Sequence, residues 1–192
     1  MCILVWNIIY KPFVFLVGFL NIRNNMIRMD AIKCIKERRS IRSYIEKDIA
    51  KEILEDIVDC GRLAPSANNI QPCEFIIITK KDLLEKISKA ATYGSFIKDS
   101  AACIVICGDE SSGHLLEDGS ASTENILLAA KAYNLGTCWI AGWKRKYNPQ
   151  IKELLNIPEN KTIVSIISVG YTEEKKEIKK KSLNEILHWD NY

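Results

Sequence analysis

The stretch DGSASTENILLAAKAYNLGTCWI, residues 118–140, carries the strongest fold signal in the chain. Residues 118–133 predict a helix that is almost wholly apolar, and the sequence Asn-Leu-Gly at 134–136 provides its C-terminal stop. A helix that is apolar on most sides is buried in the interior of a protein. Residues 137–143 then predict a strand that runs into a loop. This stretch therefore places a central helix directly before a core strand.

On either side of this stretch, short apolar runs rich in β-branched residues predict buried strands at 75–79, 102–107 and 162–169. Amphipathic spacing predicts four further helices, with Asp30 and Asp48 as N-caps of the first two and Gly61 as the stop of the second. These helices are expected at 31–38, 49–61, 82–91 and 148–155. The Pro-, Ser- and Asn-rich segment 64–72 is expected to be a loop. No linker divides residues 30–192, which we expect to form one domain.

The charge of the chain is unevenly distributed. The 192 residues carry 27 Lys and Arg against 24 Asp and Glu, and 47% of them are apolar, a composition typical of a globular domain. Residues 1–29 hold three of the basic residues (Lys11, Arg23 and Arg28) and no acidic one, so residues 30–192 balance 24 against 24. A protein-wide basic field that would attract nucleic acid is therefore excluded.

The first 29 residues form an apolar extension. Residues 3–20 carry a single charge, Lys11, beside Pro12, and they only just approach the ~20 residues that a membrane-spanning helix needs. Met26 and Met29 lie directly before the helix cap Asp30. We therefore expect an over-extended start or a non-native segment, with a weak membrane anchor through residues 3–20 as the alternative. Without such an anchor the protein is expected to be cytoplasmic, with no membrane partner.

Several kinds of active site are excluded by missing residues. The seven cysteines form no Cys-x-x-Cys pair and the chain has two histidines, so no metal site is expected and the thiols are predicted to be reduced and buried. No G-x-G-x-x-G motif follows a strand, and no G-x-S-x-G motif is present. A nucleophile paired with His114 or His188 is conceivable, although a lone histidine in a loop or tail is more often a solvated surface group.

Two basic clusters remain as candidates for binding an anion. Arg38, Arg39 and Arg42 surround Ser40, and guanidinium groups match phosphate oxygens bidentately. The alternative is a solvated helix end, where basic residues complement the helix dipole. The second cluster, Lys179–Lys181, is typical of a solubilising tail when taken alone.

Taken in order, five motifs resemble the nitroreductase family of FMN-dependent oxidoreductases. They are RRSIRSY at 38–44, LAPSANNIQP at 63–72, LGTCWI at 135–140, VGY at 169–171 and KKSLNEI at 180–186. The resemblance implies an α+β fold with a central, mostly antiparallel sheet flanked by helices. It also implies a homodimer that exchanges C-terminal arms, one FMN per subunit, and NADH or NADPH as co-substrate.

The resemblance assigns cofactor contacts to four segments. The R-x-S-x-R segment contacts the FMN phosphate, the ribityl chain and the pyrimidine edge of the ring; its residues here are Arg38, Arg39, Ser40 and Arg42. The P-S-x-x-N-x-Q-P loop reaches the flavin from the other subunit; its residues are Pro65, Ser66, Ala67, Asn69 and Gln71. Residues after the T-C-W-I motif lie near flavin N5; they are Ile140, Ala141 and Gly142. The terminal basic pair closes on the phosphate and corresponds to Lys180 and Lys181.

The chemistry that the resemblance implies belongs to the cofactor. FMN itself transfers hydride through N5, so no catalytic side chain is expected, and a cation such as Arg42 would stabilise the reduced ring. Trp143 is a candidate for the substrate side of the flavin, and Trp139 is a weaker one because core or interface packing explains it equally well. The apolar tail residues are consistent with a dimer. They are Leu183, Ile186, Leu187, Trp189 and Tyr192.

The expected reaction is ping-pong reduction of an electron-poor small molecule, such as a nitroaromatic, quinone or enone, at the expense of NAD(P)H. Two alternatives stay open. One is a specialised biosynthetic or reductively dehalogenating member of the same family, against which the short segment 91–100 argues because such enzymes carry a longer lid there. The other is a flavin-binding or membrane-tethered interaction protein without turnover.

Overall fold

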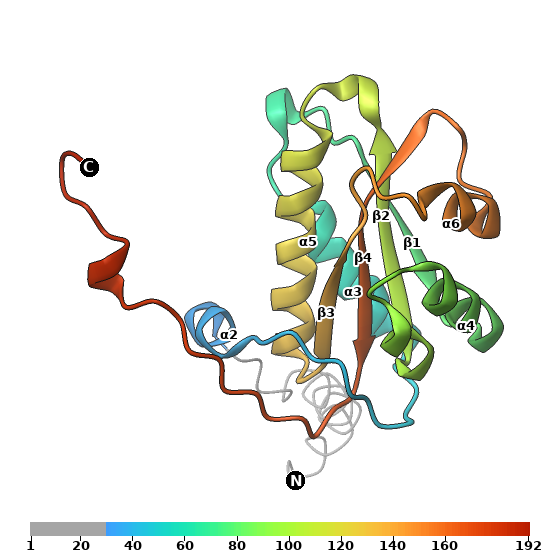
Figure 1. Ribbon diagram of the computed structural model, residues 1–192, viewed down its shortest axis with the longest axis horizontal. Coiled ribbons are helices and arrows are strands. Elements are labelled where there is room, and N and C mark those ends of the chain that lie inside the picture. Colours follow the sequence, from blue (N-terminus) through green and yellow to red (C-terminus); the bar gives the residue numbers. More distant parts are fainter. Residues whose placement is uncertain (1–29) are drawn as a thin grey trace, which may run out of the picture.

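The computed structural model describes residues 30–192, and the predicted extension at 1–29 lies outside the described residues. A four-stranded antiparallel sheet forms the centre, in the order β1-β2-β4-β3 (Figure 1). Its strands are β1 (Cys73–Ile78), β2 (Ala102–Asp109), β3 (Gly136–Ala141) and β4 (Lys161–Gly170). The α-helices of the described residues are α2 (Ala31–Glu37), α3 (Lys51–Arg62), α4 (Lys81–Ala90), α5 (Leu115–Ala132) and α6 (Asn148–Leu155). The predicted α+β class with an antiparallel sheet is confirmed.

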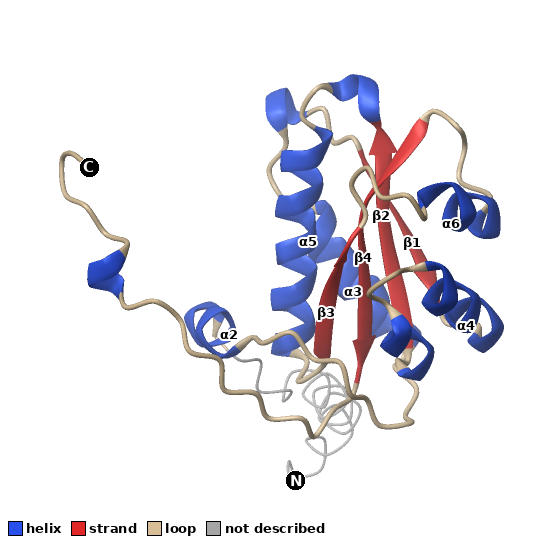
Figure 2. Ribbon diagram, viewed as in Figure 1, coloured by secondary structure: helices blue, strands red, loops and turns tan. Residues whose placement is uncertain are grey.

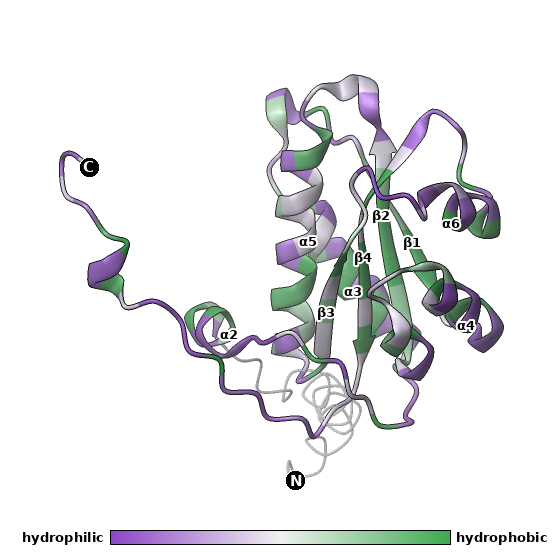
Figure 3. Ribbon diagram, viewed as in Figure 1, coloured by the Kyte–Doolittle hydropathy of each residue, from purple (hydrophilic) through white to green (hydrophobic). Residues whose placement is uncertain are grey.

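Helices cover both faces of the sheet, which explains why the central strands carry apolar residues on both faces. In β2, Cys103 and Val105 face the cluster formed with α4 and α6, whereas Ile104 and Ile106 face the cluster formed with α3 and α5. Successive side chains of a strand point to opposite faces, so both sets must be apolar when both faces are covered. Figure 3 shows this distribution, with the hydrophobic colour concentrated on the sheet.

The first half of helix α5 packs closely on β4 because Gly119 and Thr123, which face that strand, are small. A Cβ on Gly119 would come within 2.7 Å of Val164 Cγ1, so glycine is needed at this approach. One turn later, Thr123 Oγ1 donates to the carbonyl of Gly119 at 2.6 Å and lies 2.7 Å from the hydroxyl of Ser165. The predicted central helix is confirmed, although it begins at Leu115, three residues earlier than its apolar pattern indicated.

Two predicted helix ends are wrong. Asp30 does cap α2, since its carboxylate accepts the N–H of Lys33 at 3.0 Å. Asp48, in contrast, caps nothing: α3 begins at Lys51 with Ala50 at the N-cap and no side-chain cap. Gly61 does not end α3 but lies inside it, where a Cβ would sit 2.7 Å from Ile126 Cγ1. This glycine serves close packing of α3 on α5 rather than helix termination.

The tail after β4, residues 171–192, first runs beside residues 40–45, where Tyr171 and Glu174 accept backbone N–H groups. It then extends away from the sheet as loop, apart from the short helical turn η4 (Leu183–Glu185) (Figure 2). Ser182 and Glu185 form a capping box around this turn, with Ser182 N–H and Oγ both donating to Glu185 Oε2 at 2.7 Å. The predicted apolar tail residues are exposed, as in Trp189 at 79%. Among the described residues, no helix combines the length and apolarity needed to cross a membrane.

Candidate functional site

The basic segment Arg38–Arg42 lies along strand β3, at one edge of the sheet. Ser40 forms a parallel bridge with Thr137, and the N–H of Ile41 donates to the carbonyl of Thr137 at 2.8 Å. Ile41 is buried, which anchors the segment to the body of the protein. The structure therefore brings two predicted site segments, Arg38–Arg42 and the T-C-W-I strand, side by side.

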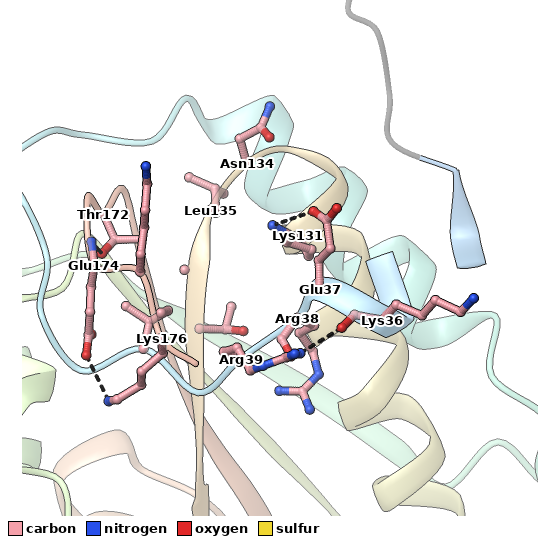
Figure 4. A pocket seen from close by; sticks show the side chains of 14 residues that line it. Lys36, Glu37, Arg38, Arg39, Lys131, Asn134, Leu135, Thr172, Glu174 and Lys176 are labelled. Atoms are coloured by element: carbon pink, nitrogen blue, oxygen red, sulfur yellow. Dashed lines mark hydrogen bonds and ion pairs between the residues drawn. The ribbon is translucent and has the colours of Figure 1, made fainter. Parts of the chain in front are cut away.

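A basic pocket opens at the start of β3 (Figure 4). It has a volume of about 460 Å³ and lies between the end of α2, the turn from α5 into β3 and the segment that follows β4. Six of its lining residues are basic and two are acidic. These eight are Lys36, Arg38, Arg39, Lys131, Lys175, Lys176, Glu37 and Glu174. The surplus of positive charge suits an anionic ligand.

Within this basic pocket, Arg39 has an unused hydrogen-bond donor. One terminal nitrogen of its guanidinium donates to the carbonyls of Lys36 and Arg38, each at 2.8 Å. Its Nε is buried and has no hydrogen-bond partner in the described part of the chain. A buried donor without a partner costs free energy that a bound acceptor such as a phosphate oxygen would recover.

Other cations of the basic pocket are already paired with acids. Lys131 Nζ lies 3.5 Å from Glu37 Oε2, and Arg38 Nε lies 3.4 Å from Glu124 Oε1. The sequence pattern does not identify three of these lysines as site residues. Lys131 is a single charge in an apolar helix, and Lys175 and Lys176 lie in a charged tail. The fold brings these lysines together around Asn134, Leu135 and Gly136 in the basic pocket.

A second pocket, of about 550 Å³, lies beyond the middle of β3 and contains aromatic side chains. Arg42 and Phe96 line it together, with the guanidinium carbon 5.7 Å from the ring centroid. Strand alternation turns Trp139 and Ala141 outward and buries Ile140 in the core. We call this the aromatic pocket. Its position next to the basic pocket gives the β3 edge one charged end and one apolar, aromatic end.

Glu174 ties the basic segment to the chain after β4. Its Oε2 accepts the backbone N–H groups of Arg42 at 3.0 Å and Ser43 at 3.1 Å. The ammonium of Lys176, 2.8 Å from the other carboxylate oxygen, and these N–H groups lower the pKa of Glu174. Beneath them, burial raises the pKa of the Cys138 thiol, an effect that the positive charges of Arg42 and Lys176 oppose.

The residues after β3 are held against the neighbouring strand. The N–H groups of Gly142 and Trp143 both donate to the carbonyl of Val164, at 3.1 and 3.0 Å. The Gly142 carbonyl accepts from Asn148 Nδ2 at 2.6 Å, and the Ala141 carbonyl accepts from the hydroxyl of Tyr147. A Cβ on Gly142 would meet the backbone N of Ser165 at 2.9 Å. Gly142 therefore serves backbone packing, and Ala141 is the residue of the Ile140–Gly142 trio that faces outward.

Trp143 packs toward the α3 and α5 side, whereas Trp139 lines the aromatic pocket. Trp143 contacts the buried cluster that includes Leu115 and Val164, and the ammonium of Lys144 lies 5.3 Å from its ring centroid. Trp139 is 38% exposed. The structure thus brings Trp139, rather than Trp143, next to Arg42.

Two further predicted segments lie away from the basic segment within one chain. The loop 64–72 precedes β1, at the sheet edge opposite β3, and contains the helical turn η1 (Ala67–Asn69). Pro65, Ser66 and Gln71 line a small pocket with Asp118 instead. Lys180 and Lys181 are exposed on the tail and line neither the basic nor the aromatic pocket. A single protomer therefore does not assemble all the predicted cofactor contacts.

Comparison with known proteins shows the family of this chain. A family model described as "Putative TM nitroreductase" matches residues 30–192. A curated protein of Archaeoglobus fulgidus, named "Putative NADH dehydrogenase/NAD(P)H nitroreductase", is 38% identical over 154 residues, covering 77% of this chain and 88% of its own. A solved FMN-dependent nitroreductase from Clostridium difficile superposes with a TM-score of 0.79 at 32% identity, covering 84% of this chain and 99% of that one. A protein of Bacillus subtilis named "FMN reductase [NAD(P)H]" is 27% identical over 169 residues, covering 76% of this chain and 67% of its own.

The fold is an α+β domain of the flavoprotein type, with the basic pocket at one edge of the sheet. The chain belongs to the nitroreductase family.

Proposed function

We propose that this protein is an FMN-dependent NAD(P)H oxidoreductase that holds its cofactor along the edge of β3. The phosphate would lie in the basic pocket and the isoalloxazine ring in the aromatic pocket. The observation that carries the proposal is the buried, unpartnered Nε of Arg39 in a pocket with six basic side chains. The names of the FMN-dependent and NAD(P)H-using relatives support the same cofactors.

The dimensions of the β3 edge fit such a ligand. Thr137 lines the basic pocket and Ala141 lines the aromatic pocket, four residues further along the strand. A strand rises about 3.3 Å per residue, so the two positions are about 13 Å apart. An extended molecule with a phosphate at one end and a planar ring at the other spans such a separation.

The protein side chains would bind and orient, and the cofactor would supply the reaction. FMN, when bound, would supply the hydride-transfer chemistry between NAD(P)H and a second substrate. Arg42 would hold negative charge at the pyrimidine edge of the ring, and Glu174 fixes its backbone through the N–H groups of residues 42 and 43. Outward-facing Ala141 leaves room for close approach to the ring, where a larger side chain would obstruct it.

We further propose a homodimer in which each flavin is completed by the second copy. Asn69 and Gln71 lie on the opposite sheet edge from Arg42, so they reach a flavin only from another protomer. The tail exposes large apolar side chains, including Leu183 at 65% and Trp189 at 79%. Exchange of these tails between copies would bury them and bring Lys180 and Lys181 toward a phosphate.

Electron-poor small molecules such as nitroaromatics, quinones or enones are the proposed oxidants, and they would alternate with NAD(P)H at one site in a ping-pong cycle. The segment between α4 and β2 favours a broad reductase over a specialised enzyme. It contains the short helical turn η2 (Ser95–Asp99), whose Ile97 side chain is fully buried. An extended lid of the kind that would enclose one particular substrate is therefore lacking at residues 91–101.

The test is flavin binding followed by turnover. Purified protein should be yellow, or become so with added FMN, and should oxidise NADH or NADPH when a quinone or nitroaromatic is present. Stopped-flow reduction of the bound flavin by each nucleotide identifies the preferred donor. A protein that stays colourless in excess FMN would overturn the proposal, whereas one that binds FMN without reduction by NAD(P)H would be a flavin-binding module.

A further inference from the structure

A buried carboxylate at the start of α5 has no place in the motifs considered above. Asp118 is only 7% exposed, and its Oδ1 accepts the backbone N–H of Ala67 at 3.0 Å. The bond joins residues 51 positions apart and links the central helix to the loop 64–72. Burying a carboxylate is costly unless it is hydrogen-bonded, so this contact calls for a role.

The loop that Asp118 contacts has an unusual backbone. Asn68, Asn69 and Gln71 all have left-handed φ angles, of 50°, 56° and 54°. Asparagine tolerates this region better than most residues, but three such residues within four positions need support from their surroundings. Part of that support is internal, because Ser66 Oγ accepts the N–H of Gln71 at 2.9 Å and Gln71 Nε2 donates to Asn69 Oδ1 at 3.1 Å.

Asp118 supplies support from outside the loop. Its carboxylate lines a pocket of about 30 Å³ together with Pro65, Ser66 and Gln71, directly beneath the loop. Its negative charge also reaches the neighbouring Cys73, whose pKa is raised by burial and further by Asp118. Arg62 lines the same pocket, but its guanidinium lies 2.7 Å from the Asp59 carboxylate, with which it forms an ion pair. The Asp118 carboxylate is therefore left to accept the N–H of the loop backbone.

We propose that Asp118 is a positioning residue that holds the loop 65–71 in the shape in which Asn69 and Gln71 contact the flavin of the partner subunit. This inference rests on the proposed function. Asp118 does not touch the flavin itself; it acts through the N–H of Ala67, which fixes the helical turn η1 on which Asn69 lies.

Asp118→Ala tests the inference, with Asp118→Asn as the conservative partner. Removing the acceptor should raise the FMN dissociation constant by about tenfold or more, because hydrogen bonds to charged groups are among the stronger ones. The amide oxygen of Asp118→Asn can still accept from Ala67, so FMN affinity should stay within about threefold of wild type. Glu117→Ala, an exposed acid on the same turn of α5, is the matched control and should bind FMN normally.

The readouts separate positioning from general stability. FMN affinity is measured by quenching of flavin fluorescence, the visible absorption of bound flavin reports the surroundings of the ring, and the melting temperature without FMN reports the fold. If Asp118→Ala fails to fold, Ala67→Pro removes the same N–H from the other side and should give the same loss. Equal FMN affinity in wild type and Asp118→Ala, or equal losses in Asp118→Ala and Asp118→Asn, would overturn the inference alone. A wild type that binds no FMN would overturn the proposed function as well.

Discussion

Among single residues, Arg39 has the surroundings that bear most directly on cofactor binding. Its guanidinium is fixed by two backbone carbonyls, and this leaves Nε buried and unpartnered in the described part of the chain. An acceptor that reaches this Nε would recover the free energy that the missing hydrogen bond costs. The basic character of residues 38–42 could be recognised from the sequence, but which guanidinium keeps a free donor depends on how α2 ends.

Arg39→Ala should weaken FMN binding by about 10- to 100-fold, the range that corresponds to about 1.5–3 kcal/mol for a hydrogen bond to a charged group. The measurement is a fluorescence titration with FMN. Lys33→Ala removes an exposed charge from α2 and serves as the control. Unchanged affinity in Arg39→Ala would show that the phosphate does not use this pocket.

Gly142, which the family resemblance assigns to the neighbourhood of flavin N5, also packs tightly against the neighbouring strand. Its N–H donates to the carbonyl of Val164. Gly142→Ala would push a Cβ to 2.7 Å from Ile163 Cγ2 and 2.9 Å from the backbone N of Ser165. We expect a loss of about 1–3 kcal/mol in the free energy of unfolding, measured by urea denaturation. A variant as stable as wild type would contradict this expectation, because the backbone after β3 would then accommodate the added methyl group without cost.

At the scale of elements, the strands and the central helix could be predicted from the sequence because their apolar periodicity is set by burial. Helix ends were less predictable. Asp48 lies two residues before the N-cap of α3, and the glycine at position 61 is required by the close packing of α3 against Ile126 of α5. The same limit applies to the site. Lys131 and Lys176 join the basic pocket through tertiary packing, which leaves no trace in local sequence.

The junction between the basic segment and the chain after β4 should depend on pH. Because the folded-state pKa of Glu174 is lowered, mainly by Lys176 and the Arg42 N–H, its stabilising effect is present above its usual value of 4.5 and is lost as pH falls below it. Comparing urea midpoints of wild type and Glu174→Gln, we expect a larger difference at about pH 7 than at about pH 4. A difference that is constant with pH would contradict this role.

At the scale of the whole molecule, the proposed dimer gives the tail and the loop 64–72 a role in the flavin site. Among the described residues, no hydrogen bond or ion pair joins residues 177–192 or the loop 64–72 to the basic segment, and the tail exposes apolar side chains over its last ten residues. Ending the chain after Ser182 should therefore reduce both dimerisation and FMN content. Analytical ultracentrifugation with absorbance at the flavin band measures the two together. A truncated protein that remains a flavin-loaded dimer would place the interface elsewhere.

The most direct test of a flavin site shared between protomers is the flavin content of mixed dimers. One protomer carries Arg38→Ala and Arg39→Ala, the other carries Asn69→Ala and Gln71→Ala, and two affinity tags isolate the mixed species. If the loop acts on the partner's flavin, each mixed dimer contains one intact site and one doubly damaged site. We predict one FMN per mixed dimer and almost none in either parent homodimer. Mixed dimers without flavin would contradict the account, because both halves of each site would then come from the same chain.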